Sequence, residues 1–119
     1  MTVEGRIVLE VSSLTEGLTR IVLSGRLDTP GVDQVETQFV AAAVPPAKNV
    51  VVDLSRVTFI SSMGIRMLVS VARSLQQRRA RLVLYGPTPL VSQVFEHVSL
   101  RDLMPIVADE TAAIAEITS

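Results

Sequence analysis

The residues best suited to chemistry in this chain are two adjacent serines, Ser61 and Ser62, followed closely by Gly64. They stand where a β-rich segment gives way to a helical pattern, so a serine here can cap the free N–H groups of a helix start. A helix N-terminus also favours negative charge, and the same position would tolerate a phosphoryl group on Ser62. The spacing permits a capping role and a phosphorylation role, and the two can coexist.

Enzymatic signatures are missing around these serines. Residues 59–64 do not match the G-x-S-x-G nucleophile elbow, and the chain holds neither the G-x-G-x-x-G nor the G-x-x-x-x-G-K-[ST] phosphate-binding loop. The single histidine, His97, is predicted near a helix end, where a surface or capping role explains it. The best-placed acids, Asp28 and Asp53, are about 25 residues apart, with nothing to pair them for acid–base work. We therefore expect no enzyme, no catalytic residue and no cofactor.

Composition narrows the function further. The 119 residues are 48% apolar, 3% aromatic and carry a net charge of −1, which suits one domain over residues 1–119 with an aliphatic core. Balanced charge and few aromatics argue against a nucleic-acid partner, and without cysteine no metal site is expected. No apolar run suggests a signal peptide or membrane insertion, so we expect a cytoplasmic protein. We interpret one basic cluster as a solvated helix end: Arg73, Arg78, Arg79 and Arg81.

The first half of the chain predicts the elements that position the serines. Alternating apolar residues indicate a strand over residues 6–11, joined through a glycine-containing loop to a second strand over 18–24. Thr29-Pro30 is typical of a helix start, with the threonine as cap and the proline in the first turn. Residues 49–54 are almost unbroken in β-branched character, which predicts a strand buried on both faces at the centre of the sheet.

The second half repeats the alternation of helix and strand. A helix is predicted from the serine pair to about residue 77, then a strand over 81–85, and a helix from Thr88-Pro89 to about His97. A short edge strand over 105–107 and a last helix capped by Asp109 complete the series. This order predicts an α/β fold with a mixed, mostly parallel sheet and an N-terminal hairpin.

Two motifs then give the chain a resemblance. Residues 51–65, VVDLSRVTFISSMGI, resemble the signature of STAS domains, the sulphate-transporter and anti-sigma-antagonist family, and residues 23–30, LSGRLDTP, resemble its Gly-x-Leu-Asp segment. Residues 81–86 occupy the place of the family's next strand, so the resemblance covers essentially the whole chain. It implies four to five strands with helices mainly on one side.

The resemblance also implies a function. A free-standing STAS domain is most similar to bacterial anti-sigma factor antagonists, which bind an anti-sigma factor that is also a serine kinase. The kinase phosphorylates the antagonist and ends the interaction, and a phosphatase of the PP2C type restores it. By position in the motifs, Ser62 corresponds to the phosphorylated serine and Asp28 to an acid near the partner-binding surface.

Three residues depart from the family's pattern. Ser61 replaces an aspartate and is an alternative phosphate acceptor, Met63 replaces a second serine, and Arg66 stands where glycine is frequent. Met63 and Arg66 should make the contact face larger and more charged, which suggests a partner different from that of the sporulation-type systems. The partner-binding surface is therefore predicted to consist of Asp28, Thr29, Ser61, Ser62, Met63 and Arg66.

Two other functions remain open from the sequence. A STAS accessory subunit of a lipid-transport ABC ATPase complex would bind its ATPase constitutively, and Ser62 would never carry phosphate. A hydrolase or small-ligand-binding domain would depend on His97. The short edge strand and mild net charge also permit a weak homodimer.

Overall fold

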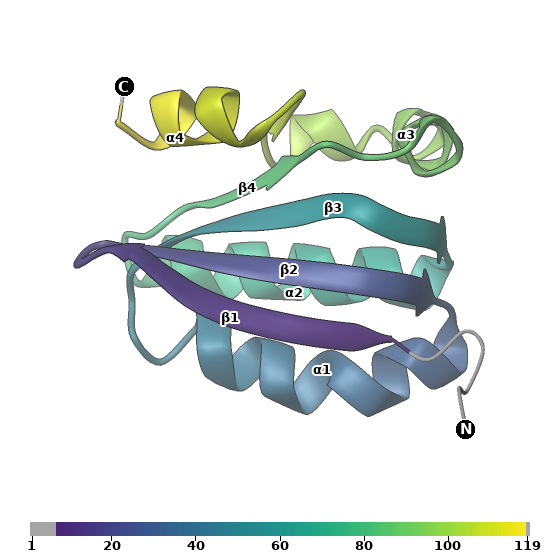
Figure 1. Ribbon diagram of the computed structural model, residues 1–119, viewed down its shortest axis with the longest axis horizontal. Coiled ribbons are helices and arrows are strands. Elements are labelled where there is room, and N and C mark those ends of the chain that lie inside the picture. The colour runs from purple at the N-terminus through teal and green to yellow at the C-terminus, as the bar shows by residue number, and fades with distance from the viewer. Residues whose placement is uncertain (1–6, 119) are drawn as a thin grey trace.

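The computed structural model describes residues 7–118, in which the strands form one five-stranded sheet in the order β1-β2-β3-β4-β5 (Figure 1). The hairpin β1–β2 is antiparallel and the other three pairings are parallel, which confirms the predicted mixed, mostly parallel sheet. The strands are β1 (Val8–Thr15), β2 (Leu18–Leu27), β3 (Asn49–Ile60), β4 (Leu82–Tyr85) and β5 (Ile106–Val107).

The α-helices follow the predicted order, and one short 3₁₀ helix over residues 100–102 was not predicted. They are α1 (Thr29–Ala43), α2 (Ser62–Gln77), α3 (Pro89–His97), the short 3₁₀ helix η1 (Leu100–Asp102) and α4 (Glu110–Thr118). The caps Thr88 and Asp109 are in the predicted places, since Thr88 Oγ1 accepts from Val91 N and Asp109 Oδ1 accepts from Ala112 N. Local capping signals therefore located these helix starts correctly.

Three strands are longer than predicted. β2 continues past its predicted end at residue 24 to Leu27, so residues 25–27 stay paired in the sheet and do not leave it. β1 continues to Thr15, so the expected loop over residues 12–17 is reduced to a turn at Glu16 and Gly17. β3 continues to Ile60, because residues beyond Leu54 pair in parallel with the end of β2, the last pair being Leu27 with Ile60. The predicted central position of β3 is confirmed, with Val50, Val51 and Val52 fully buried.

One face of the sheet carries the larger core, which is aliphatic apart from two phenylalanines. α1 and α2 lie along this face (Figure 1), and α3 adds Val91 and Phe95 to the same cluster. Its largest fully buried side chains include Phe39 of α1 and Leu75 of α2. Removing such side chains from water is the main term that stabilises the fold.

The opposite face is covered by α4. Ala113 is fully buried there against Leu18, Val51 and Val83 of the sheet, and Ile114 and Ile117 pack beside it. Three helices therefore pack on the larger cluster, and α4 packs on the smaller one. This agrees with the expected placement of helices mainly on one side of the sheet.

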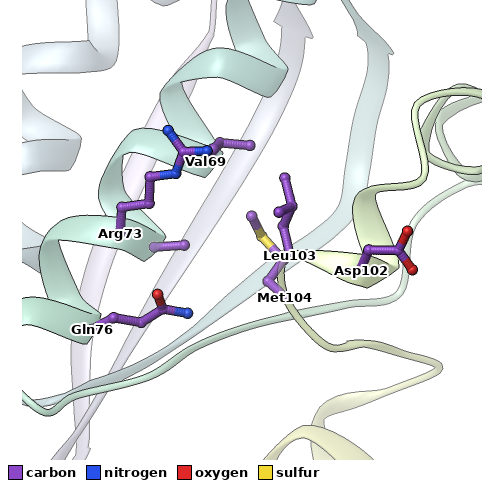
Figure 2. Close-up of a pocket in the computed structure, with 7 residues that line it drawn as sticks. Val69, Arg73, Gln76, Asp102, Leu103 and Met104 are labelled. Atoms are coloured by element: carbon purple, nitrogen blue, oxygen red, sulfur yellow. The ribbon is translucent and has the colours of Figure 1, made fainter.

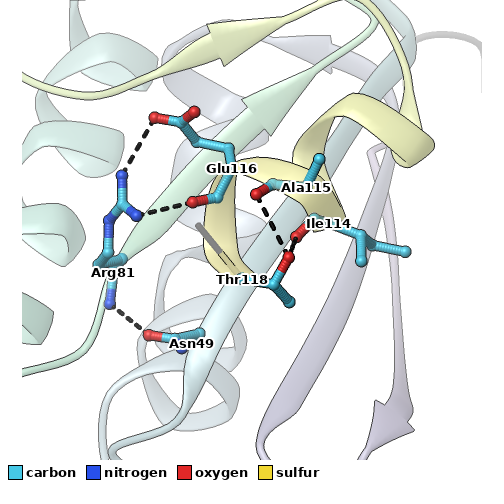
Figure 3. A network of polar contacts seen from close by, with 6 residues as sticks. All are labelled: Asn49, Arg81, Ile114, Ala115, Glu116 and Thr118. Atoms are coloured by element: carbon cyan, nitrogen blue, oxygen red, sulfur yellow. Dashed lines mark hydrogen bonds and ion pairs between the residues drawn. The ribbon is translucent and has the colours of Figure 1, made fainter.

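Polar contacts hold α4 at both ends. At its start, the Glu110 carboxylate accepts from Arg20 Nη1 at 2.8 Å and from the Tyr85 hydroxyl at 3.3 Å. Near its end, the Arg81 guanidinium donates to the Glu116 carbonyl at 2.8 Å and to its carboxylate at 3.2 Å (Figure 3). Burial raises the pKa of Tyr85, and the carboxylates of Asp53 and Glu110 raise it further.

Candidate functional site at the start of helix α2

The site lies where two parallel strands end side by side. Leu27 at the end of β2 is in register with Ile60 at the end of β3. The residues that follow them, Asp28 and Ser61, are the N-caps of α1 and α2. Parallel register therefore brings two predicted segments, residues 28–29 and 61–63, to one edge of the sheet, although about 30 residues separate them in the chain.

Ser61 connects the two segments. Its Oγ accepts from the backbone N–H of Gly64 at 3.3 Å and donates to the carbonyl of Leu27 at 3.0 Å. Its own backbone N–H donates to the same carbonyl at 2.9 Å. Ser61 is thus the cap that the sequence predicted at this junction, and its hydroxyl is used both as donor and as acceptor.

Gly64 allows the first turn of α2 to approach β2 closely. A Cβ at this position would lie 2.8 Å from Ile60 Cγ1 and 3.0 Å from the carbonyl oxygen of Leu27. Both separations are shorter than side chains tolerate without a shift of their neighbours. A glycine here therefore keeps the helix start against the end of β2, where Ser61 can reach Leu27.

Ser62 is placed differently from its neighbour. It is the first residue of α2 and is exposed, and its hydroxyl makes no hydrogen bond within residues 7–118. The first turn of a helix presents N–H groups without intrahelical partners, and its dipole favours negative charge. Ser62 accordingly combines an accessible hydroxyl with an environment that accepts an anion.

Met63 and Arg66 differ in how much surface they offer. Met63 is half-buried and packs against the larger core cluster, whereas Arg66 is exposed one turn after Ser62. Residues four apart on a helix lie on one face, so Arg66 is placed on the side of Ser62. Of these two predicted contact residues, Arg66 is accessible to a partner and Met63 is accessible only in part.

Asp28 caps α1, which corrects the prediction that Thr29 is the cap. The Asp28 carboxylate accepts from Gly31 N at 2.8 Å, while Thr29 is the exposed first residue of the helix. The hydrogen bond from Gly31, together with Arg26, lowers the pKa of Asp28. The physical reason for the correction is where the helix begins: Asp28 still has extended backbone angles, as a cap does, whereas Thr29 is already the first helical residue.

Two residues beside the site were not singled out from the sequence as contacts. The guanidinium carbon of Arg26 lies 4.5 Å from the centroid of the Phe59 ring, and its Nε donates to Asp28 at 3.2 Å. Arg26 and Phe59 are register partners on β2 and β3. Their contact depends on that long-range pairing, and only the presence of Phe59 in the motif pointed toward it.

Other residues considered from the sequence lie apart from this site. His97 is the exposed last residue of α3, as predicted, and Asp53 accepts from the N–H and hydroxyl of Ser55. Within the described part of the chain, no cluster of histidine, cysteine or acidic side chains could hold a metal ion. No helix among residues 7–118 is both long and apolar enough to cross a bilayer.

Comparisons of the sequence match this chain to a family and to curated relatives. A family model described as "Mlab, STAS domain" matches residues 5–107. The chain is 32% identical over 100 residues to BtrV of Bordetella bronchiseptica, a candidate anti-sigma factor antagonist, covering 84% of this chain and 86% of the relative. It is 28% identical over 86 residues to the anti-sigma-B factor antagonist of Listeria monocytogenes, covering 72% and 75%.

Solved structures show the same fold. The anti-sigma factor antagonist SpoIIAA in its unphosphorylated form superposes with a TM-score of 0.77 at 26% identity, covering 93% of this chain and 96% of that one. An anti-sigma factor antagonist from Mycobacterium paratuberculosis superposes with a TM-score of 0.87 at 20% identity, covering all of both chains. With the family match over residues 5–107 and the two motifs at one sheet edge, these similarities show that the chain belongs to the STAS domain family.

Proposed function

We propose that this protein is an anti-sigma factor antagonist that acts by binding and not by catalysis. Its binding surface consists of Asp28, Thr29, Ser61, Ser62, Met63 and Arg66, and its partner is a kinase-type anti-sigma factor. The names of the relatives support the antagonist role. The meeting of residues 28–29 and residues 61–63 at one edge of the sheet supports the placement of the surface.

The accessible hydroxyl of Ser62 is the observation that carries the proposal. Ser62 is exposed at the first position of α2, whereas the Ser61 hydroxyl is engaged with Leu27 and Gly64. A kinase must reach the oxygen it modifies, and modification of Ser61 would disrupt the cap of α2. This difference favours Ser62 over Ser61 as the phosphate acceptor.

The transfer would use chemistry supplied by the partner. Ser62 Oγ attacks the γ-phosphorus of ATP bound to the kinase, a new O–P bond forms, and the bond from that phosphorus to the β–γ bridging oxygen breaks. ADP leaves, and the hydroxyl proton passes to a base of the kinase. A phosphatase of the PP2C type then hydrolyses the phosphoserine and regenerates the hydroxyl.

Phosphate on Ser62 should change binding more than folding. A phosphoryl group adds nearly two negative charges, which the N-terminus of α2 and Arg66 in the next turn can accommodate. A partner surface shaped for a neutral hydroxyl cannot accommodate them without desolvation and repulsion. About 1.4 kcal/mol of such a penalty already weakens binding tenfold. We place this switch in the cytoplasm, where the sigma factor and ATP are available.

The test is phosphorylation by the purified cognate anti-sigma factor with ATP, followed by mapping of the modified residue. Wild type and Ser61→Ala should accept phosphate, Ser62→Ala should not, and Ser62→Asp should bind the partner weakly. Phosphate mapped to Ser61 in the wild type would overturn the site assignment. If neither serine is modified and Ser62→Asp binds normally, the switch is wrong, and constitutive binding to a lipid-transport ATPase becomes the function to test.

A further inference from the structure

A hollow of about 200 Å³ lies between the second half of α2 and the chain that follows η1 (Figure 2). Val69, Ala72, Arg73 and Gln76 line it from α2, and Leu103 and Met104 line it from the other side. A smaller hollow of about 40 Å³ continues from it beside Gln76 and Pro105. The two hollows share lining residues from α2 and from the chain after η1, and both lie at the end of α2 opposite Ser62.

The walls of this hollow combine polar side chains with an apolar patch formed by Val69, Ala72, Leu103 and Met104. Ala72 and Met104 are buried at its base, Val69 is half-buried, and Leu103 leaves 44% of its surface exposed at the rim. Ligand pockets for cofactors are usually larger, about 300 to 1,000 Å³. The size of the hollow and its apolar patch therefore suit one large apolar side chain of a protein partner, with polar groups beside it.

The hollow shares a helix face with Ser62. Five residues of α2 follow one another at spacings of three and four, which places them along one side of a helix: Ser62, Arg66, Val69, Arg73 and Gln76. We call this row the α2 stripe. By the 1.5 Å rise per residue it extends about 20 Å, so a single partner surface can span it.

Charge along the α2 stripe has one sign. α2 contains Arg66 and Arg73 and no acidic residue, although the whole chain carries a net charge of −1. Both arginines are exposed, and neither makes an ion pair within residues 7–118. Asp102 also lines the hollow, and its carboxylate points away from α2 in Figure 2. An acidic partner complements this face and a basic one does not.

We propose that the partner surface extends from Ser62 along the α2 stripe to this hollow. The occupant is an acidic segment of the anti-sigma factor that places one large apolar side chain between Val69 and Leu103 and sets carboxylates opposite Arg66 and Arg73. This inference rests on the proposed function, since it names the part of the partner that lies beyond the phosphorylation site. It makes Arg73 and Leu103 determinants of partner choice.

The test measures binding of the purified anti-sigma factor to three charge-altered variants. Arg73→Glu and Leu103→Glu should each weaken binding at least tenfold, and both residues are exposed enough for the variants to fold. Arg56→Glu is the matched control for Arg73→Glu, because it makes the same change of charge at an exposed position on β3, outside the α2 stripe. Its affinity should stay within twofold of wild type.

A cross-linking experiment identifies the occupant itself. A photoreactive phenylalanine derivative in place of Leu103 should cross-link to a segment of the purified anti-sigma factor rich in aspartate and glutamate. A cross-link to a basic segment, or to none, would contradict the assignment. Circular dichroism of each variant separates a loss of binding from a loss of fold.

The outcomes separate this inference from the proposed function. If Ser62→Asp weakens binding while Arg73→Glu and Leu103→Glu bind like wild type, the α2 stripe and hollow are not part of the surface and the antagonist function stands. If wild type does not bind the anti-sigma factor at all, the proposed function is wrong and this inference falls with it.

Discussion

Replacing each serine of the pair by alanine should give opposite results for stability and for phosphorylation. In Ser61→Ala, α2 loses the cap that accepts from Gly64 N, and the Leu27 carbonyl loses one of its two donors. That carbonyl keeps the bond from the backbone N–H of residue 61, so no buried acceptor is left unpaired. The expected loss is therefore that of a cap alone, about 1 kcal/mol of unfolding free energy.

Ser62→Ala removes a hydroxyl that is exposed and makes no hydrogen bond within the described residues. Surface substitutions of this kind change the unfolding free energy by less than about 0.5 kcal/mol. We therefore expect Ser61→Ala to be the less stable of the two variants. Only Ser62→Ala should lose the ability to accept phosphate.

Urea denaturation followed by circular dichroism measures the difference. With a slope of about 1 to 2 kcal/mol per molar urea, the midpoint of Ser61→Ala should fall by about 0.5 to 1 M and that of Ser62→Ala should barely move. Ser61→Thr is the control, because threonine keeps a hydroxyl that can serve as cap, and its midpoint should stay near wild type. If Ser61→Ala is as stable as wild type and Ser62→Ala is destabilised, the assignment of Ser61 as the cap and of Ser62 as the exposed, unbonded hydroxyl is refuted.

Three further changes test the packing beside the site, its acid and the docking of α4. Gly64→Ala should lower the unfolding free energy by about 1 to 3 kcal/mol in urea denaturation, because the added Cβ would lie 3.0 Å from the Leu27 carbonyl oxygen. Asp28→Asn keeps an oxygen that can cap α1 but cannot titrate. Because the pKa of Asp28 in the folded protein is lowered from 3.8, the wild type should lose unfolding free energy as the pH falls below that value. The variant should lose less over the same pH range. Glu110→Ala should lower the unfolding free energy by at most about 1 kcal/mol. It should also lower the pKa of Tyr85 toward its ordinary value, which an ultraviolet titration measures.

Each of these changes has a result that would contradict its reasoning. Gly17→Ala, where a Cβ would meet no atom within 4 Å, is the control for Gly64→Ala, and equal stabilities of the two variants would show that the approach of α2 to β2 is not restrictive. An Asp28→Asn variant as acid-sensitive as wild type would remove Asp28 from the pH dependence. An unchanged Tyr85 titration in Glu110→Ala would show that Glu110 does not contribute to the raised pKa of Tyr85.

Local signals in the sequence were sufficient for the order of elements and for the position of the serine pair. Thr88-Pro89 marks a helix start without help from the rest of the chain, because caps act over three residues. The β-branched run in residues 50–52 likewise indicated a central strand, since such runs are buried on both faces. The STAS resemblance, carried by two short motifs, added the expected binding surface.

Tertiary structure decided the features that depend on contacts between distant residues. The length of β3 to Ile60 and the contact of Arg26 with Phe59 follow from parallel register, which no local pattern encodes. The hollow beside Leu103 exists only because the chain after η1 packs near α2.

The serine pair shows this division most clearly. The sequence placed two adjacent hydroxyls at a helix start, where a serine can cap the helix or be modified, and the STAS resemblance assigned the phosphate to Ser62 with Ser61 as the alternative. Only the fold brings the Leu27 carbonyl within 3.0 Å of Ser61, and that contact engages one hydroxyl and leaves Ser62 exposed. The physical reason is that a hydrogen bond needs its partner at contact distance, and here the partner lies 34 residues earlier in the chain.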